Sequence, residues 1–434
     1  MSNSQPVATK KTKRPRGLLA SRKNNGHTTE SEPPAKRPRG DDALPQDSIE
    51  LKAQDWQDLD ELFENVLDAL HGPNWTSAIP LVRGVLHECA RMVTVYNDPT
   101  LIYSPLEQET LIDSEKVPAS AFYTIYASAW FIMSTFARND ASLLTEDEPQ
   151  DPLEYQLSAL AACEKGQQAL DIRKQPKAWD LEFIRGRALV AAAQSSLDSD
   201  DQPQASENGA ADARAHFLDP DSSAALGRAL GHLTYAVDQR PRSTDSSNGI
   251  EAEQKSKDER FVRALLESAQ GILVISESLQ SQNSSPVHHL EACRKLVHRV
   301  EDIPVSEELR IQLVLHLGQT DLAIGSNIAE RLEDESNDKE PCGDEAKTRA
   351  TATQSLKEAI AKFDTVRDLC SKQPSGKGES VAEELKSMLQ EALVTLAILL
   401  PEGPEQEGMY SRYQTEGGVL DGRGRGRRRV TAIV

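Results

Sequence analysis

The sequence predicts an all-α protein, a superhelix of paired helices with a disordered tail at each end. Three observations lead to this prediction. Ala, Leu, Glu, Gln and Lys are abundant, whereas aromatic residues make up only 5% of the chain, and this composition favours helices over strands. Apolar residues recur at steps of three and four, and no stretch alternates as a strand does. Short loops with Pro, Gly, Asp and Asn place neighbouring helices antiparallel.

Helical periodicity begins at about Leu51, and five helices follow in order. The first has one apolar face and ends at the pair Gly72-Pro73, because both residues break helices. The apolar face of this first helix consists of Trp56, Leu59, Phe63, Val66, Leu67 and Leu70. The next four helices are expected at residues 78–97, 119–138, 152–173 and 177–197.

One segment, residues 117–137, contains no charged side chain and is long enough to span a bilayer. It follows a proline, however, and it is rich in Ala and Ser where a membrane span would have Leu, Ile and Val. Small residues at helical spacing suit close packing against other helices. We therefore predict a buried helix of a helical core here, not a membrane span.

Small residues also recur in a way typical of the tetratricopeptide repeat (TPR), whose second helix carries Ala, a large apolar residue, Ala and Pro at fixed steps. One stretch meets all four steps, one meets three, and one keeps the small-residue rhythm. These stretches are Ala229-Leu233-Ala236-Pro241, Ala359-Phe363-Val366 and Ala162-Gly166-Ala169. Small residues seven apart mark any close helix crossing, so an irregular helical solenoid remains the alternative to a TPR-like array.

Composition divides the chain into three parts. Residues 1–50 are basic, contain almost no large apolar side chains, and are expected to be disordered. The TPR-like array is expected over 51–400, and 401–434 form a C-terminal segment ending in a basic Arg-Gly tail. Within the array, polar stretches predict flexible insertions at 198–221, 241–258 and 333–347.

Charge is distributed unevenly along the chain, whose net charge is −20. Residues 1–40 carry +8 (ten Lys/Arg against two Asp/Glu) and residues 421–434 carry +4 (five against one), which leaves −32 for the remainder. An acidic body repels phosphate, so nucleic-acid binding by the array is not expected. Any RNA contact would come from the tails.

The motifs of common enzyme classes are missing from the sequence. There is no Gly-rich phosphate loop and no GxSxG nucleophile elbow. The five cysteines are far apart and odd in number, which predicts neither a disulfide framework nor a zinc site and favours a reducing compartment. The run His87-Glu88-Cys89 holds metal-ligand types, but consecutive helix residues point about 100° apart. We predict no catalytic activity, no cofactor and no metal.

Two compact basic clusters near the N-terminus are interrupted by proline, which keeps a peptide extended and reduces the entropy cost of binding. An import receptor reads such clusters, so we interpret them as nuclear localisation signals and predict a nuclear protein. The basic residues concerned are Lys10, Lys11, Lys13, Arg14, Arg16, Lys36, Arg37 and Arg39. Electrostatic association with RNA is the alternative, although no aromatic residues are interleaved for base stacking.

The C-terminal run GRGRGRRR is a second segment that is a candidate for contact with RNA. Arg-Gly segments bind RNA through phosphate contacts and guanidinium stacking, and the same run also resembles a third basic signal. The candidate RNA-contacting residues are Arg423, Arg425, Arg427, Arg428 and Arg429.

Several stretches, in the same order, resemble the fungal enhancer of translation termination family, which includes a fission-yeast negative regulator of an Ofd-type 2-oxoglutarate oxygenase. KRPRGLL (13–19) is similar to that family's opening tag, and GVLHECARM (84–92) to one of its helices. FYTIYASAW (122–130) and MYSRYQTEGG (409–418) are similar to two further helices. Arg16 replaces the usual Leu and Ala90 replaces an Asp, and the Arg-Gly tail has no counterpart in the family.

The resemblance implies a TPR-like nuclear adaptor without catalytic activity. It implies partners among the 2-oxoglutarate oxygenase, the import receptor and translation-termination factors, and a requirement for correct translation termination. His87, Glu88 and Arg91 become candidate partner-binding residues, with packing and capping inside the repeat as the alternative. From the residues alone, a helical array offers a long surface to a partner, and an acidic one favours a basic partner. The rival hypotheses are an RNA-associated scaffold and an inhibitor that occupies a partner's active site.

Overall fold

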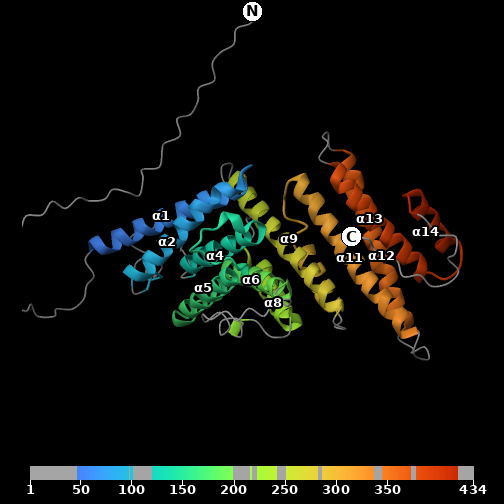
Figure 1. Ribbon diagram of the computed structural model, residues 1–434, viewed down its shortest axis with the longest axis horizontal. Coiled ribbons are helices and arrows are strands. Elements are labelled where there is room, and N and C mark those ends of the chain that lie inside the picture. Colours follow the sequence, from blue (N-terminus) through green and yellow to red (C-terminus); the bar gives the residue numbers. More distant parts are fainter. Residues whose placement is uncertain are drawn as a thin grey trace, which may run out of the picture. The chain divides into compact units, whose positions relative to one another are not determined.

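The structure is a computed structural model that describes residues 46–96, 98–100, 120–198, 216–217, 222–241, 251–281, 286–336, 345–372 and 378–418. These residues belong to one compact unit, Gln46–Val434. The described part is helical and contains no strand. Its α-helices (Figure 1) are α1 (Gln46–Leu70), α2 (Ile79–Val95), α4 (Ala121–Asn139), α5 (Pro152–Ile172), α6 (Trp179–Asp198), α8 (Ser222–Gln239), α9 (Glu251–Ser281), α10 (Val287–His298), α11 (Glu307–Ser336), α12 (Glu345–Ser371), α13 (Gly378–Leu399) and α14 (Pro404–Thr415).

Consecutive helices pack as antiparallel pairs, which their side-chain contacts make plain. In the α11–α12 pair, Gly318 lies against Phe363 and Gly325 lies against Leu356. Residue numbers therefore rise along α11 while those of the contacting residues fall along α12, so the two helices are antiparallel. The α4–α5 pair has the same order, since a Cβ at Gly166 would lie close to Tyr123, and the rings of Trp130 and Tyr155 lie with their centroids 5.9 Å apart. The prediction of antiparallel helix pairs is confirmed.

The pairs are arranged in two rows. The first helices of the pairs contact one another in sequence and form the first row, which consists of α4, α6, α9, α11 and α13. These contacts run parallel: Arg187 of α6 meets Glu267 of α9, and Val190 of α6 meets Gly271 of α9. The second helices α5, α8, α10 and α12 each pack against two members of the first row. This is the layering of a TPR-like array, and it confirms the predicted fold class.

Small residues let the paired helices approach closely, as the TPR spacing predicts. A Cβ added to Gly186 of α6 would lie 2.7 Å from the Cγ atom of Leu233 and 3.2 Å from the carbonyl oxygen of Ala229 on α8. Gly325 of α11 repeats this arrangement, because its Cβ would lie 2.6 Å from the Cγ atom of Leu356. Ala229, Leu233 and Ala236 are fully buried, so the stretch that meets every TPR step lies at a helix crossing.

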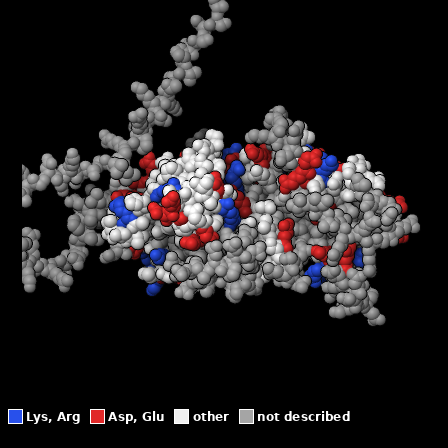
Figure 2. All heavy atoms as spheres, viewed as in Figure 1, with Lys and Arg blue, Asp and Glu red and all other residues white. Residues whose placement is uncertain are grey.

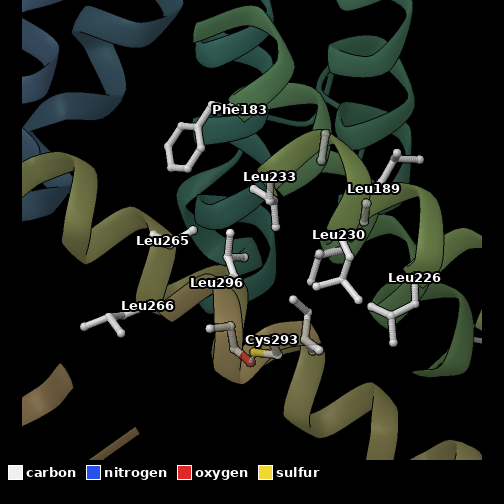
Figure 3. Close-up of a cluster of buried hydrophobic side chains, with 14 of the residues drawn as sticks. Phe183, Leu189, Leu226, Leu230, Leu233, Leu265, Leu266, Cys293 and Leu296 are labelled. Atoms are coloured by element: carbon white, nitrogen blue, oxygen red, sulfur yellow. Dashed lines mark hydrogen bonds between the residues drawn. The ribbon is translucent and has the colours of Figure 1, made fainter. Parts of the chain in front are cut away.

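Three hydrophobic clusters follow one another along the chain. The N-terminal cluster joins α1, α2, α4, α5 and α6, the central cluster joins α5 to α11, and the C-terminal cluster joins α9 to α13. Side chains from α6, α8, α9 and α10 converge in the central cluster, where Phe183, Leu233, Leu265 and Leu296 are labelled in Figure 3. Burial of each such side chain stabilises the fold by about 1.5–3 kcal/mol. Neighbouring clusters share helices, so the core is continuous.

Helix starts follow the local sequence. Helix α5 begins with Pro152, whose missing N–H costs nothing in the first turn, and the Asp151 side chain accepts a hydrogen bond from the Leu153 amide at 2.9 Å. Helix α14 also begins with a proline, Pro404. The start of α5 at Pro152 is the one that the sequence predicts.

Helices occupy parts of the chain that the sequence analysis assigns to insertions or places beyond the array. Helix α9 begins at Glu251, inside the stretch 241–258 expected to be an insertion, and α12 begins at Glu345, inside 333–347. Residues 251–258 are rich in Glu, Gln, Lys and Ala, so they extend a helix even without an apolar face. Helix α14 lies beyond residue 400 and packs on α13, where Met409 and Tyr413 cover the C-terminal cluster. Its Arg412 also donates to the Asp364 carboxylate of α12 at 2.6 Å.

The uncharged segment 117–137 largely coincides with α4, which packs against α2, α5 and α6. Ala127, Ser128 and Ala129 are buried in these contacts. Among the helices described, none combines the length and the apolarity needed to cross a bilayer. The prediction of a packed helix at this position is confirmed.

Candidate protein-binding surface

Most of the predicted site residues lie outside the described residues. This holds for both N-terminal basic clusters (Lys10, Lys11, Lys13, Arg14, Arg16, Lys36, Arg37 and Arg39) and for the C-terminal arginines (Arg423, Arg425, Arg427, Arg428 and Arg429). Their roles in nuclear import and RNA contact stay predictions. Only the group on α2 can be placed.

The α2 group is held by bonds within the molecule. Arg91 donates to Glu88 through Nε at 2.9 Å and pairs with Asp55 of α1 at 2.7 Å. The Tyr96 hydroxyl also donates to Asp55, and desolvation, followed by this bond, raises the pKa of Tyr96 to about 12. His87 is exposed. The arrangement fastens α1 to α2, as the packing alternative expects, and a partner-binding role of this group stays a prediction.

A second group joins three helices of the first row through an arginine. The Arg187 guanidinium carbon of α6 lies 4.5 Å from the ring centroid of Phe131 of α4 and 5.7 Å from that of Phe183. Its Nη2 atom pairs with Glu267 of α9 at 2.9 Å. Burial lowers the pKa of Arg187, and Glu267 opposes this effect. Since the guanidinium is used for stacking and pairing, this group holds the row together.

A third group is a buried ionic centre in the second half of the array. The Asp321 carboxylate of α11 is fully buried and pairs with Arg294 of α10 at 3.0 Å and with Lys362 of α12 at 2.7 Å. Two cations from two helices therefore compensate one buried charge. An isolated carboxylate at this depth would be costly, so the centre fixes how α10 and α12 sit on α11.

The face of α11 that points away from α12 is different, because it is open. Gly318, Asp321 and Gly325 turn towards α12, whereas Gln312, Ala323 and other residues on the remaining side are exposed or half-buried. This open stripe consists of Gln312, Leu315, Gln319, Ala323, Ser326 and Glu330. Helix α11 contacts both α9 and α13 and lies between them in Figure 1. We call this stripe, together with the exposed residues Glu277 of α9 and Glu391 and Ile398 of α13, the three-helix face.

Two carboxylates approach each other across this face. Glu277 of α9 and Glu391 of α13 are both solvent-exposed, yet surrounding protein raises the pKa of each. The negative charge of Glu277 raises the pKa of Glu391 further, and the Ser326 hydroxyl of α11 opposes this shift. No ion pair involves either glutamate within the described residues.

The described residues show little that resembles reaction chemistry. Their buried cysteines are free thiols, and burial raises the pKa of both Cys163 and Cys293 to about 12, which disfavours a thiolate. No three His, Cys, Asp or Glu side chains of the described part are grouped to hold a metal ion. On the face shown in Figure 2, acidic and basic side chains of the described residues are interspersed.

These observations define a helical-repeat protein whose first-row helices leave open faces. Two solved structures of Nro1 share the fold. A structure described as the S. pombe nuclear import adaptor Nro1 covers 86% of this chain and 97% of its own, with 14% sequence identity and a TM-score of 0.53. A second, described as showing that the hypoxic regulator of sterol synthesis Nro1 is a nuclear import adaptor, covers 87% and 96%, with 15% identity and the same TM-score. No protein-family model and no curated protein sequence matches the chain.

Proposed function

We propose that the chain is a non-enzymatic adaptor that binds a protein and carries it into the nucleus. The observation that supports this most is the fold it shares, over almost the whole length of both chains, with a nuclear import adaptor. The architecture agrees, because parallel first-row helices present open faces to a partner. The sequence adds two basic clusters that have the character of import signals.

The partners follow from the family resemblance of the sequence. We propose that the cargo is a 2-oxoglutarate oxygenase, that an import receptor reads the basic clusters, and that translation-termination factors depend on the complex. Direct binding would also regulate the oxygenase. His87, exposed on α2 beside the Glu88–Arg91 pair, stays a candidate contact for such a partner.

The import function is tested by removing the basic clusters from the full chain. A fluorescent fusion lacking residues 1–40 should leave the nucleus, while its affinity for co-purified protein partners in lysate stays unchanged. A matched control replaces only the basic residues of both clusters by Gln and keeps the length of the segment. Nuclear retention of both variants, together with an unchanged distribution of every partner, contradicts the proposal.

An RNA-associated scaffold is the second candidate, and the run GRGRGRRR at 422–429 is the observation that favours it. Deletion of residues 421–434 separates the two functions. Loss of crosslinking to RNA with unchanged localisation supports the scaffold. Affinity purification followed by mass spectrometry gives the complementary result, since recovery of RNA without any stoichiometric protein partner excludes the adaptor.

A further inference from the structure

The three-helix face carries a pair of like charges that the protein itself does not compensate. Glu277 and Glu391 come from helices that flank α11, and each side chain is exposed. Glu267 lies two to three turns before Glu277 on α9 and is paired with Arg187. The negative charge of Glu267 is therefore compensated within the protein, in contrast to that of Glu277. No Lys or Arg acts on Glu277 or Glu391 among the groups that shift their pKa values.

The surface between the two glutamates is suited to contact by another chain. Helix α11 contacts both of the helices that carry the glutamates, and its half-buried Ala323 and Ser326 have small side chains. Beside it on α13, Ile398 is one of the few large apolar side chains exposed in the described residues, at 45%. Ile398 follows Glu391 by seven residues, which is two helical turns or about 10 Å along the same side of the helix. An acidic position and an apolar position therefore lie in line.

We propose that the three-helix face binds a segment of the partner protein that places an Arg or Lys between Glu277 and Glu391 and an apolar side chain on Ile398. This inference rests on the proposed adaptor function and specifies its binding surface. Charge complementarity selects the occupant, because residues 41–420 carry a net −32, and the negative charge of Glu277 acts on Glu391 while no Lys or Arg acts on either. A guanidinium is the best fit, since it can donate to two carboxylates at once.

A synthetic peptide tests the chemistry without a known partner. The probe is an Ala- and Gln-based helix of about 20 residues, long enough to be helical, with one Arg and one Leu seven residues apart. Its control carries Gln in place of Arg. Fluorescence anisotropy with the full chain should show that the Arg peptide binds about tenfold more tightly or better, and that added salt reduces the difference.

Variants of the chain complete the test. The double variant Glu277→Gln/Glu391→Gln should bind both peptides equally, whereas Glu154→Gln, an exposed glutamate on α5, should leave the tenfold preference intact. Thermal unfolding gives a readout that needs no ligand, because removal of one negative charge by Glu391→Gln should leave the unfolding temperature equal or higher. Equal affinity of the two peptides for the natural chain, absence of binding by both, or a preserved preference in the double variant overturns the inference.

Failure of this surface can be told apart from failure of the adaptor function. If the double variant still carries its partner into the nucleus, the three-helix face is not the binding surface and the adaptor function stands. If removal of residues 1–40 changes neither localisation nor the distribution of a partner, the adaptor function fails whatever the peptides do.

Discussion

Glycine at the crossing of paired helices gives the sharpest test of the packing described here. Gly325 of α11 lies so close to α12 that an added Cβ would sit 2.6 Å from the Cγ atom of Leu356 and 3.3 Å from the carbonyl oxygen of Ala352. Leu356 is fully buried, and its Cγ is a branch point, so it cannot swing aside without moving the rest of its side chain. Gly325→Ala must therefore push the two helices apart.

The size of the effect follows from two opposing contributions. Overpacking a core costs about 1–3 kcal/mol. Replacing Gly by Ala inside a helix contributes about 1 kcal/mol of stabilisation, because Ala loses less backbone entropy. We expect Gly325→Ala to destabilise the protein by about 1 kcal/mol net, and Gly186→Ala, with its contact of 2.7 Å to Leu233, to behave the same way.

A matched control lies on α8. Gly231 is exposed, and an added Cβ there would meet nothing within 4 Å, so Gly231→Ala should stabilise the protein by about 1 kcal/mol. Urea unfolding followed by circular dichroism should show the midpoint falling for Gly325→Ala and rising for Gly231→Ala. Equal rises for both substitutions would refute the reasoning that close helix approach requires glycine at the crossing.

The remaining predictions concern buried polar groups. Asp321→Asn removes the charge that compensates Arg294 and Lys362, so we expect a loss of about 3 kcal/mol in chemical denaturation, whereas Asp238→Asn, in an exposed ion pair, should change stability by less than about 1 kcal/mol. Burial lowers the pKa of His316 to about 4, so between pH 6.5 and 4 the unfolded chain binds a proton that the folded chain does not, and stability falls as the pH is lowered through this window. The full effect is about 3 kcal/mol, and His316→Gln should flatten the pH dependence of the unfolding midpoint over that range. An unchanged slope in that variant would assign the acid sensitivity to other groups.

The helices were predictable because their signals are local. Apolar spacing and breakers such as Gly72-Pro73 locate α1, α2, α4, α5 and α6 within a few residues. The small residues Ala229 and Ala359 also predicted that their helices pack closely against another helix. This signal is local, because a close crossing requires a small residue whichever helix is the partner. Helix α14 was not expected as part of the array, because its attachment depends on Arg412 reaching Asp364 of α12, a contact with no local signature.

The candidate surface was not predictable from the sequence in the same way. Glu277 and Glu391 lie on different helices, and each reads as one exposed carboxylate among many in an acidic chain. Only the order of α9, α11 and α13 in the first row brings them to one face. The burial of Asp321 was equally unpredictable, because a charged residue in an amphipathic helix normally indicates the side that faces solvent. Single-sequence patterns show which face of a helix is apolar, but not which helices will flank it.

The order of the three hydrophobic clusters has a consequence for how the protein is made. The N-terminal cluster draws on residues between Trp56 and Ile184, the central cluster on residues between Leu153 and Leu317, and the C-terminal cluster on residues between Leu273 and Leu400. A chain emerging from the ribosome can therefore bury each cluster as soon as its last helix appears, using the preceding helices as a template. The array can then grow from the N-terminus in the order of synthesis. The N-terminal and central clusters can be buried before the C-terminal helices have been made.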